Sequence, residues 1–335
     1  MNPTSLTALR NLLCAAALAA LSPAILAADN PFIGNWALTI PGGGAGWLGI
    51  KESDGQLKGE ILWGGGSVVP VNSAKVDGST LVIQRIYEPR QRGAAAKTAP
   101  ARETETIKAT REGDNLKLTT EREKEGKVSG KASFSGKRIT PLPPAPDLAK
   151  LKFGDAIVLF NGKDMSGWKV MGSPSGWRVE NSVLVNDAKQ EEGEHKSYAN
   201  IRTEREFEDF NLTLDTRVPK NGNSGIYLRG IYEVQVADSF GKGKDSHNMG
   251  GVYSRITPTE NAAKPAGEWQ TYDITLANRH VTVILNGKKI IDNQPLLGCT
   301  GGALWSDEFR PGPIYLQGDH TSVDYRNLIL RPIKK

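Results

Sequence analysis

NGNSGIYLRGIYEVQ is the sequence of residues 221–235. Asn-Gly and Asn-Ser-Gly are turn sequences, because Asn and Gly both tolerate positive φ angles. The apolar residues that follow predict two short strands, with a bend or bulge at Gly230. The stretch therefore predicts a turn that leads into a pair of neighbouring strands.

Alternation along the second predicted strand divides its side chains into two sets. Successive side chains of a strand point to opposite faces, so Glu233 and Gln235 share one face. The other face carries the apolar residues, which are Tyr232, Val234 and Val236. The apolar set suits a hydrophobic core. A carboxylate and an amide are left on a face that either holds a polar ligand or is simply solvated.

Strand-like sequence continues on both sides of this stretch, and no run is typical of a long amphipathic helix. Short alternating segments between Gly, Asp-Gly and Asn turns predict a small antiparallel β-barrel or sandwich domain over residues 29–140. Beyond Phe153, the alternation in residues 211–218 and the turn Asn286-Gly287 predict antiparallel strands and a hairpin. We expect an all-β protein with a two-sheet jelly roll over residues 153–335.

A proline-rich segment separates the two predicted domains. Residues 141–146 read PLPPAP, a composition typical of a stiff, extended linker. We therefore expect residues 141–152 to be the linker and the domain boundary.

The N-terminus has the pattern of a secretory signal peptide. A basic residue precedes an apolar run at residues 12–21, and small residues follow at 27–28. The run is too short to span a bilayer. Cleavage after residues 1–28 would remove Cys14 and leave Cys299, so we expect no internal disulfide. We expect a periplasmic or secreted protein without a membrane span.

The charge balance excludes one class of partner. The chain has 42 basic and 37 acidic residues, a formal net charge of +5 for 335 residues. Basic and acidic residues are interleaved, without a block of one sign, which is typical of a solvated surface. We therefore expect no nucleic-acid partner.

Five motifs, in order, carry a resemblance to a known family. They are Leu159–Trp168, Asn223–Arg229, Tyr232–Gln235, Gly267–Tyr272 and Gly312–Gln317. Together they resemble the 3-keto-disaccharide hydrolase family, also described as 3-keto-glucoside 1,2-lyase/3-keto-2-hydroxy-glucal hydratase. The likeness covers roughly residues 153–333 and does not extend to the N-terminal half.

The resemblance implies a concanavalin A-like sandwich that meets a sugar already oxidised at C3. A ketone at C3 makes the proton on C2 acidic, so a base can remove it and the C1 substituent leaves by β-elimination. Water can then add to the product, which makes the net reaction a hydrolysis. The implied substrate is a 3-keto-glycoside, and an upstream sugar 3-dehydrogenase must supply it.

Three residues are the candidates for catalysis. Glu233 belongs to a family motif and lies on the polar strand face. His320 and His247 are candidate bases, because an unperturbed imidazole titrates near neutral pH. Relatives of the family tend to have a different sequence around His320, where this chain has an extra Gly318. The extra residue predicts that His320 points in a somewhat different direction from its counterpart in the family.

The candidate substrate-binding residues are aromatic, amide and basic: Asn223, Tyr227, Arg229, Gln235, Tyr253, Trp269 and Gln317. Arg229 could stabilise an enolate oxygen or pair with Glu233. No cofactor is required by this chemistry. A divalent cation could also stabilise the enolate, with Asp238, Glu233 and the two histidines as ligands, although no spacing marks a metal site.

Two other functions remain open. A non-catalytic carbohydrate-binding module would use the same sheet face and aromatics. A conventional glycoside hydrolase needs two carboxylates that flank the bond. The nearest pair is Glu233 and Asp238, which would face opposite sides of a regular strand.

Overall fold

The computed structural model describes residues 30–40, 44–87, 102–190 and 196–334. Within these ranges the secondary structure is almost entirely antiparallel strand, with one short 3₁₀ helix, η2 (Leu148–Lys150). The predicted all-β class is confirmed. The predicted signal peptide lies outside the described residues. No helix in the described part of the chain is long and apolar enough to cross a membrane.

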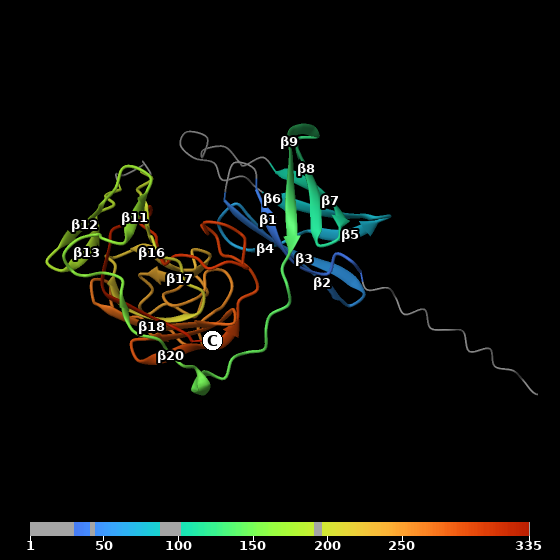
Figure 1. The fold of residues 1–335 in the computed structure, drawn as a ribbon. Coiled ribbons are helices and arrows are strands. Elements are labelled where there is room, and N and C mark those ends of the chain that lie inside the picture. The colour runs from blue at the N-terminus through green and yellow to red at the C-terminus, as the bar shows by residue number, and fades with distance from the viewer. Residues whose placement is uncertain (1–29, 41–43, 88–101, 191–195, 335) are drawn as a thin grey trace, which may run out of the picture. The chain divides into compact units, whose positions relative to one another are not determined.

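The first half of the chain forms a nine-stranded sheet, here called the N-terminal sheet (Figure 1). Its strands are β1 (Gly34–Thr39), β2 (Ala45–Ser53), β3 (Gln56–Trp63), β4 (Val69–Pro70), β5 (Ser73–Asp77), β6 (Thr80–Tyr87), β7 (Glu103–Glu112), β8 (Asn115–Lys124) and β9 (Lys127–Arg138). The order is β4-β3-β2-β1-β9-β8-β7-β6-β5, so the two end strands are consecutive in the chain.

The N-terminal sheet curls around its own core. Between the end strands, Val71 donates a backbone hydrogen bond to Gly59 of β3, and Asn72 donates one to Gln84 of β6. The sheet therefore curls until its ends meet. Its core is a cluster that includes Trp36, whose indole N–H donates to the carbonyl of Phe32 at 3.0 Å.

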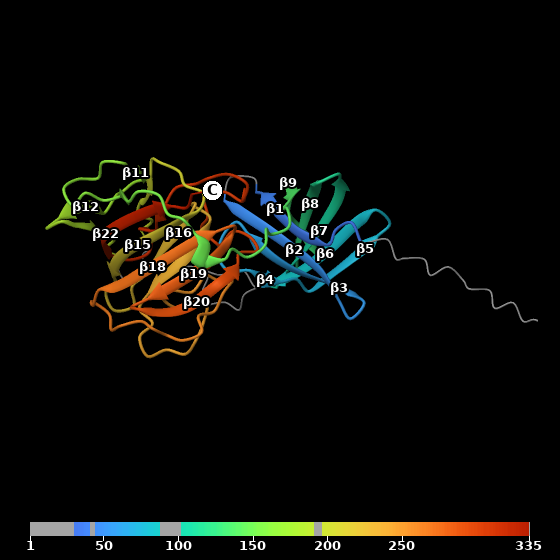
Figure 2. The ribbon, with the colours of Figure 1, turned by 60° about the horizontal axis from the view of Figure 1, so that its bottom comes forward.

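The second half forms two further sheets. The larger has the order β12-β13-β22-β15-β18-β19-β20, with β10 paired to β22 (Figure 2). Its strands are β10 (Ile157–Val158), β12 (Trp177–Glu180), β13 (Val183–Asn186), β15 (Phe210–Arg217), β18 (Gln270–Ala277), β19 (His280–Leu285), β20 (Lys288–Pro295) and β22 (Val323–Pro332). The smaller has the order β11-β14-β21-β16-β17. Its strands are β11 (Trp168–Met171), β14 (Asn200–Thr203), β21 (Tyr315–Leu316), β16 (Asn223–Leu228) and β17 (Tyr232–Ala237).

One hydrophobic core joins these two sheets. In β15 the residues Leu212 and Leu214 are buried and alternate with half-buried polar residues, as the sequence predicted. Val234 and Val236 of β17 belong to the same core cluster. The jelly-roll-like sandwich expected from the sequence is therefore the architecture of this half.

The N-terminal sheet also contributes to this core. Leu38 and Leu48 point into the curled sheet, while their neighbours Ala37 and Trp47 belong to the core cluster of the sandwich. Strands β1 and β2 therefore bury both of their faces, as alternation allows. Residues 32–335 form one compact unit, and the domain boundaries drawn from the sequence stay a prediction.

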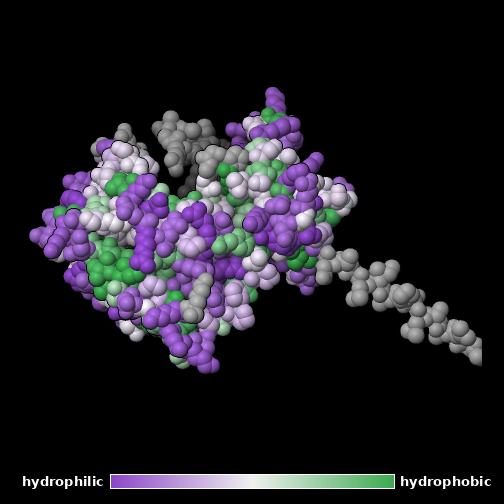
Figure 3. Space-filling model, viewed as in Figure 1, coloured by the Kyte–Doolittle hydropathy of each residue, from purple (hydrophilic) through white to green (hydrophobic). Residues whose placement is uncertain are grey.

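The predicted linker follows the surface of the sandwich. The Arg279 guanidinium donates to the carbonyls of Thr140 and Pro141 at 2.8 and 3.0 Å. The amide of Asn293 donates to the carbonyl of Pro146 at 2.9 Å. On the face shown in Figure 3, hydrophilic side chains cover most of the surface, consistent with the interleaved charges of the sequence.

Candidate functional site

The hairpin of β16 and β17 carries the centre of the candidate site. Tyr227 pairs directly with Glu233, and Gly225 pairs with Gln235, so all four project to the same face of the smaller sheet. Tyr315 of β21 pairs with Tyr227 on its other side. We call this surface the Glu233 face. The opposite face belongs to the core, as the alternation predicted.

The glycine in this hairpin provides the space for the carboxyl group. A Cβ on Gly225 would overlap Oε1 of Glu233. The turn of the hairpin places Arg229 and Gly230 at positive φ, 55° and 68°. Two consecutive positive φ angles are the requirement of a type I′ turn, so the bend predicted at Gly230 is the hairpin turn itself.

Glu233 is almost completely buried, with 3% of its surface exposed. The Tyr227 hydroxyl lies 2.9 Å from its Oε2. Burial raises the pKa of Glu233 from an ordinary value of 4.5 to about 8, the Tyr227 hydrogen bond opposes this, and the negative charge of Asp319 adds to it. At neutral pH the carboxyl group is therefore mostly protonated.

The hydrogen bonds of Tyr227 agree with a protonated Glu233. Its hydroxyl lies 2.9 Å from Glu233 Oε2 and 2.8 Å from the carbonyl oxygen of Gly301. A phenol has one proton to donate, and a carbonyl oxygen can only accept. Both contacts are satisfied when Tyr227 donates to Gly301 and Glu233 donates to Tyr227.

A second pair of titratable groups lies next to Glu233. His320 Nδ1 is 2.7 Å from Asp319 Oδ1, and the imidazole has 42% of its surface exposed. The hydrogen bond to Asp319 raises the pKa of His320, and burial opposes the rise. Asp319 also raises the pKa values of Glu233 and Tyr227, which places its charge near both. The Asp319–His320 pair therefore borders the Glu233 face.

The extra glycine before this pair is tightly packed. Gly318 donates its N–H to Asn200 at 2.7 Å and accepts from the Asn186 amide at 2.9 Å. A Cβ at this position would overlap the indole of Trp177. The insertion thus fixes the backbone from which Asp319 and His320 project.

His247 lies on the loop that runs along the edge of β17. Its Nδ1 is 2.6 Å from Asp245 Oδ1, its Nε2 is 3.0 Å from Ser67 Oγ, and its ring packs edge-on against Tyr253 at 4.6 Å. The Gln235 amide donates to its backbone carbonyl at 3.2 Å. His247 and Tyr253 are therefore neighbours of Gln235.

The three candidate amides lie around the same face. Gln235 donates to the Asn223 side chain at 3.2 Å. The Oε1 atoms of Gln235 and Gln317 are buried and accept no hydrogen bond from the described residues. Buried acceptors of this kind require a partner, and a sugar hydroxyl is a suitable one.

Two candidate residues are not brought to the Glu233 face. The Arg229 guanidinium donates to the backbone carbonyls of Glu308 and Arg310, so it is not paired with Glu233. Trp269 is covered by the guanidinium groups of Arg217 and Arg326, at 4.7 and 4.0 Å from its ring. Arg217 alternates with the buried residues of β15 and so lies on the outer face of the larger sheet.

Four residues at the site were not among the candidates. Tyr315 belongs to the family motif Gly312–Gln317 and alternates onto the Glu233 face, and Asp319 directly precedes the candidate His320, so their positions were a usable signal. Gly301 and Ser67 reach the site from segments far away in the sequence. Nothing in their local sequence indicates this.

The proposed metal ligands are not gathered in the structure. No group of three His, Cys, Asp or Glu side chains within the described ranges is arranged to hold a metal ion. Asp238 instead accepts the backbone N–H of Asn221 at 2.9 Å. The dependence on a divalent cation stays a prediction.

Comparison with known proteins gives one family and several relatives. A sequence model of the 3-keto-alpha-glucoside-1,2-lyase-like domain matches residues 155–331, more than half of the chain. A protein named 3-keto-disaccharide hydrolase from Bacteroides thetaiotaomicron is 26% identical over an alignment of 166 residues, and the match covers 41% of this chain and 57% of that protein. The chain thus spans less than two thirds of that relative.

Two solved structures each match somewhat more than half of this chain. A candidate glycosyl hydrolase from Parabacteroides distasonis is 31% identical, covering 58% of this chain and 94% of its own, with a TM-score of 0.44. A second candidate glycosyl hydrolase from the same organism is 22% identical. The match covers 53% of this chain and 94% of the other, with a TM-score of 0.43.

Proposed function

Since this chain belongs to the family of 3-keto-alpha-glucoside-1,2-lyase-like domains, we propose that it is an exported enzyme that cleaves 3-keto-glycosides. The resemblance inferred from the sequence motifs agrees with this family. The observation that supports the proposal is that Asp319, which is hydrogen-bonded to His320, lies close enough for its charge to act on the buried Glu233. Protonated Glu233 is an acid, and the Asp319–His320 pair is a base.

The reaction requires one base and one acid. The base takes the proton from C2, and the electron pair of that C–H bond forms the enolate with the C3 ketone. The enolate then expels the C1 oxygen, which takes a proton from the acid. Addition of water across the resulting C1–C2 double bond gives the free 3-keto-sugar.

We assign the base to His320. Its imidazole is the more exposed of the perturbed groups, and Asp319 holds Nδ1. In the neutral ring with Nδ1 protonated, Nε2 carries the lone pair that abstracts a proton. A pKa raised above 6.5 makes this nitrogen a stronger base near neutral pH.

We assign the acid to Glu233, with Tyr227 beside it. A carboxyl group with a pKa of about 8 is a proton donor at neutral pH. Both side chains are buried in this structure, so the surrounding groups must move aside for the sugar to reach them. Catalytic hydrogen bonds commonly tighten only when substrate is bound.

Amides surround the place where the sugar would lie. Gln235 and Gln317 present buried oxygens without a hydrogen-bond partner in the described structure, and Asn223 lies next to Gln235. Hydroxyl groups of the sugar would donate to these oxygens. The C3 ketone itself must come from a separate sugar 3-dehydrogenase.

A conventional two-carboxylate mechanism is less well supported. Glu233 lies near the start of β17, and Asp238 follows its end. Five residues of strand separate them by about 16 Å, whereas the carboxylates of glycosidases lie about 5–9.5 Å apart. A binding module would not require the perturbed pKa values of Glu233 and His320.

The test is incubation with a 3-keto-disaccharide in D₂O. We expect cleavage with deuterium at C2 of the product, because proton removal and hydration both exchange that position. Cleavage of the unoxidised disaccharide at a similar rate would contradict the proposal. Binding of intact glycan without turnover would favour a carbohydrate-binding module.

A further inference from the structure

One segment of the sandwich lies between the N-terminal sheet and the Glu233 face. Within it, the Thr300 side chain accepts the backbone N–H of Glu233 at 2.9 Å, and the Gly301 carbonyl accepts from the Tyr227 hydroxyl at 2.8 Å. At its end, Ser306 donates its hydroxyl proton to the carbonyl of Leu38 in β1 at 2.7 Å. Residues 299–306 therefore connect the two halves at the site.

The loop after β3 packs directly on this segment. A Cβ on Gly301 would overlap the backbone of Gly66, so the two glycines are in close backbone contact. Gly64 and Gly66 have φ angles of 75° and 71°, which favour glycine. The contact places the loop Gly64–Ser67 next to the carbonyl group that Tyr227 binds.

The last residue of this loop, Ser67, contacts the candidate residue His247. Ser67 is half-buried, and its Oγ lies 3.0 Å from Nε2 of His247. On the other side of the ring, Nδ1 lies 2.6 Å from Asp245 Oδ1. A carboxylate can only accept, so Nδ1 carries a proton, and in the neutral ring Nε2 accepts from the Ser67 hydroxyl.

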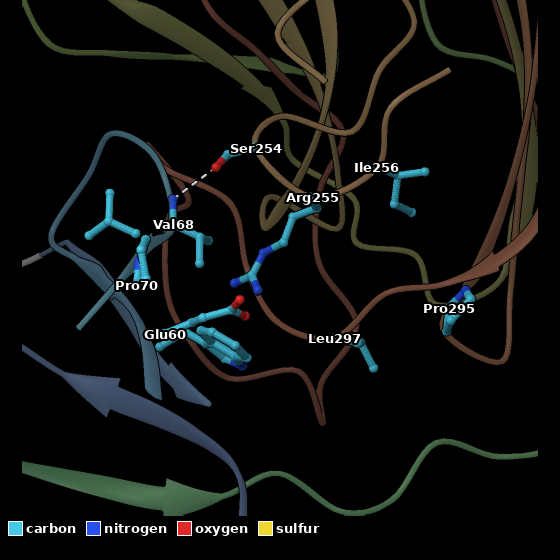
Figure 4. Close-up of a pocket in the computed structure, with 10 residues that line it drawn as sticks. Glu60, Val68, Pro70, Ser254, Arg255, Ile256, Pro295 and Leu297 are labelled. Carbon is cyan, nitrogen blue, oxygen red and sulfur yellow. Dashed lines mark hydrogen bonds between the residues drawn. The ribbon is translucent and has the colours of Figure 1, made fainter. Parts of the chain in front are cut away.

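Neighbouring contacts fix this loop in place (Figure 4). The backbone N–H of Val68 donates to the Ser254 hydroxyl at 2.9 Å. The Arg255 guanidinium lies 4.2 Å from the centre of the Trp47 ring and donates to the carbonyl of Cys299. The close-up shows this guanidinium directed toward Glu60 of β3. The Val68 contact thus holds the end of the loop independently of His247.

We propose that the N-terminal sheet is part of the carbohydrate site, with Ser67 as a positioning residue that holds Nε2 of His247 and so fixes the orientation of the ring. The inference rests on the proposed function and assigns a role to the half of the chain that the family match does not cover. With Asp245 on Nδ1 and Ser67 on Nε2, the His247 ring is held against Tyr253 and beside Gln235. Tyr253 and Gln235 contact the sugar, and His320 remains the base. Fixed hydrogen-bonding groups of this kind reduce the entropy that binding must overcome.

The experiment compares Ser67→Ala with Ser254→Ala in the mature full-length protein. Ser254 holds the same loop through Val68 but makes no hydrogen bond to His247, so it is the matched control. For Ser67→Ala we expect KM for a 3-keto-disaccharide to rise about tenfold with kcat within about twofold of the wild type. Ser254→Ala and Ser67→Thr, which keeps the hydroxyl, should remain within about threefold in KM.

The ¹⁵N resonances of the His247 imidazole give a readout that does not depend on turnover. We expect Ser67→Ala to shift the Nε2 signal and Ser254→Ala to leave it in place, with thermal melting recorded to verify folding. Unchanged Nε2 and KM in Ser67→Ala would overturn the inference. If the wild type does not cleave the substrate, the proposed function fails, and the Nε2 signal alone then decides whether Ser67 positions His247.

Discussion

Two buried glutamates, Glu233 and Glu308, each bind a tyrosine of the β16–β17 hairpin but differ in their other neighbours. Tyr232 donates to Glu308 at 2.8 Å, as Tyr227 contacts Glu233 at 2.9 Å. The two carboxyl groups are 2% and 3% exposed. Glu308 makes an ion pair with Arg279 at 3.4 Å, whereas the charge that acts on Glu233 is that of another acid, Asp319.

On this difference we propose that Glu308 is a structural carboxylate and Glu233 a functional one. Burial raises the pKa of Glu308, and the Tyr232 hydrogen bond and the charges of three arginines, Arg279, Arg255 and Arg229, oppose this rise. The ionised form of Glu308 therefore has cationic partners. For Glu233, no basic side chain in the described ranges forms an ion pair with it. A buried charge without a partner is expensive, so Glu233 holds its proton. Titratable groups with shifted pKa values and no ion-pair partner are concentrated at functional sites.

The largest expected effect is the loss of turnover in Glu233→Gln. The amide keeps the size of the side chain but cannot deliver the proton, so kcat on a 3-keto-disaccharide should fall about 10³-fold or more. Steady-state kinetics near pH 7 measure this. Turnover within about tenfold of the wild type would mean that Glu233 is not the acid.

Glu308→Gln should lose stability but keep turnover, the reverse of what we expect for Glu233→Gln. The variant leaves Arg279 buried without its carboxylate, so the free energy of unfolding should fall by about 3 kcal/mol. Turnover, measured well below the melting temperature, should stay close to that of the wild type. Urea denaturation of both glutamine variants gives the comparison, and a larger loss of stability in Glu233→Gln would invert the assignment of roles.

Much of this hairpin could be predicted from its sequence. Alternation is a local property of a strand, so the polar face of Glu233 and Gln235 and the apolar face of Val234 and Val236 followed directly. The all-β class followed from strand spacing and turns. Tyr227 and Glu233 are candidates from two neighbouring family motifs, and the structure pairs them across the hairpin.

Contacts between distant segments could not be predicted in this way. Arg229 was expected on a strand face, but the turn at Gly230 begins one residue earlier and directs the guanidinium to carbonyls of the 308–310 loop. Trp269 looked like a sugar-stacking residue, yet only the tertiary structure shows that two arginines cover it. The contacts of Ser67 and Gly301 depend on packing between halves that are far apart in the sequence.

His320→Asn tests the Asp319–His320 pair, with an expected fall in kcat of about 10²-fold. In the wild type, activity should rise through the pKa of His320, which lies above 6.5, and fall near pH 8 as Glu233 ionises. Asp319→Asn should move the acidic limb to lower pH, because the hydrogen bond and the charge that raise the pKa of His320 are removed. If the rise of activity on the acidic side of the pH profile is unchanged in both variants, a group other than His320 causes it.

The smallest expected effect, per pH unit, is a change in the free energy of unfolding with pH. A comparison of the wild type with Glu233→Gln separates the contribution of Glu233 from those of the other titrating groups. Its folded pKa of about 8 lies above the ordinary value of 4.5, so the folded state binds the proton more tightly than the unfolded chain. The stability that this proton gives is complete below pH 4.5 and is lost as pH rises to about 8.

Glu233→Gln cannot titrate at this position, so its stability relative to the wild type should increase by about 1 kcal/mol per pH unit across that interval and then level off. Taking the difference between the two proteins removes the contributions of His320 and Glu308, which are present in both. Urea denaturation at pH 5, 6, 7 and 8 measures it. If the difference in the free energy of unfolding between the two proteins does not change with pH, Glu233 is ionised in the folded protein. Glu233 would then not differ from Glu308 in this respect, and it would have no proton to give to the leaving oxygen.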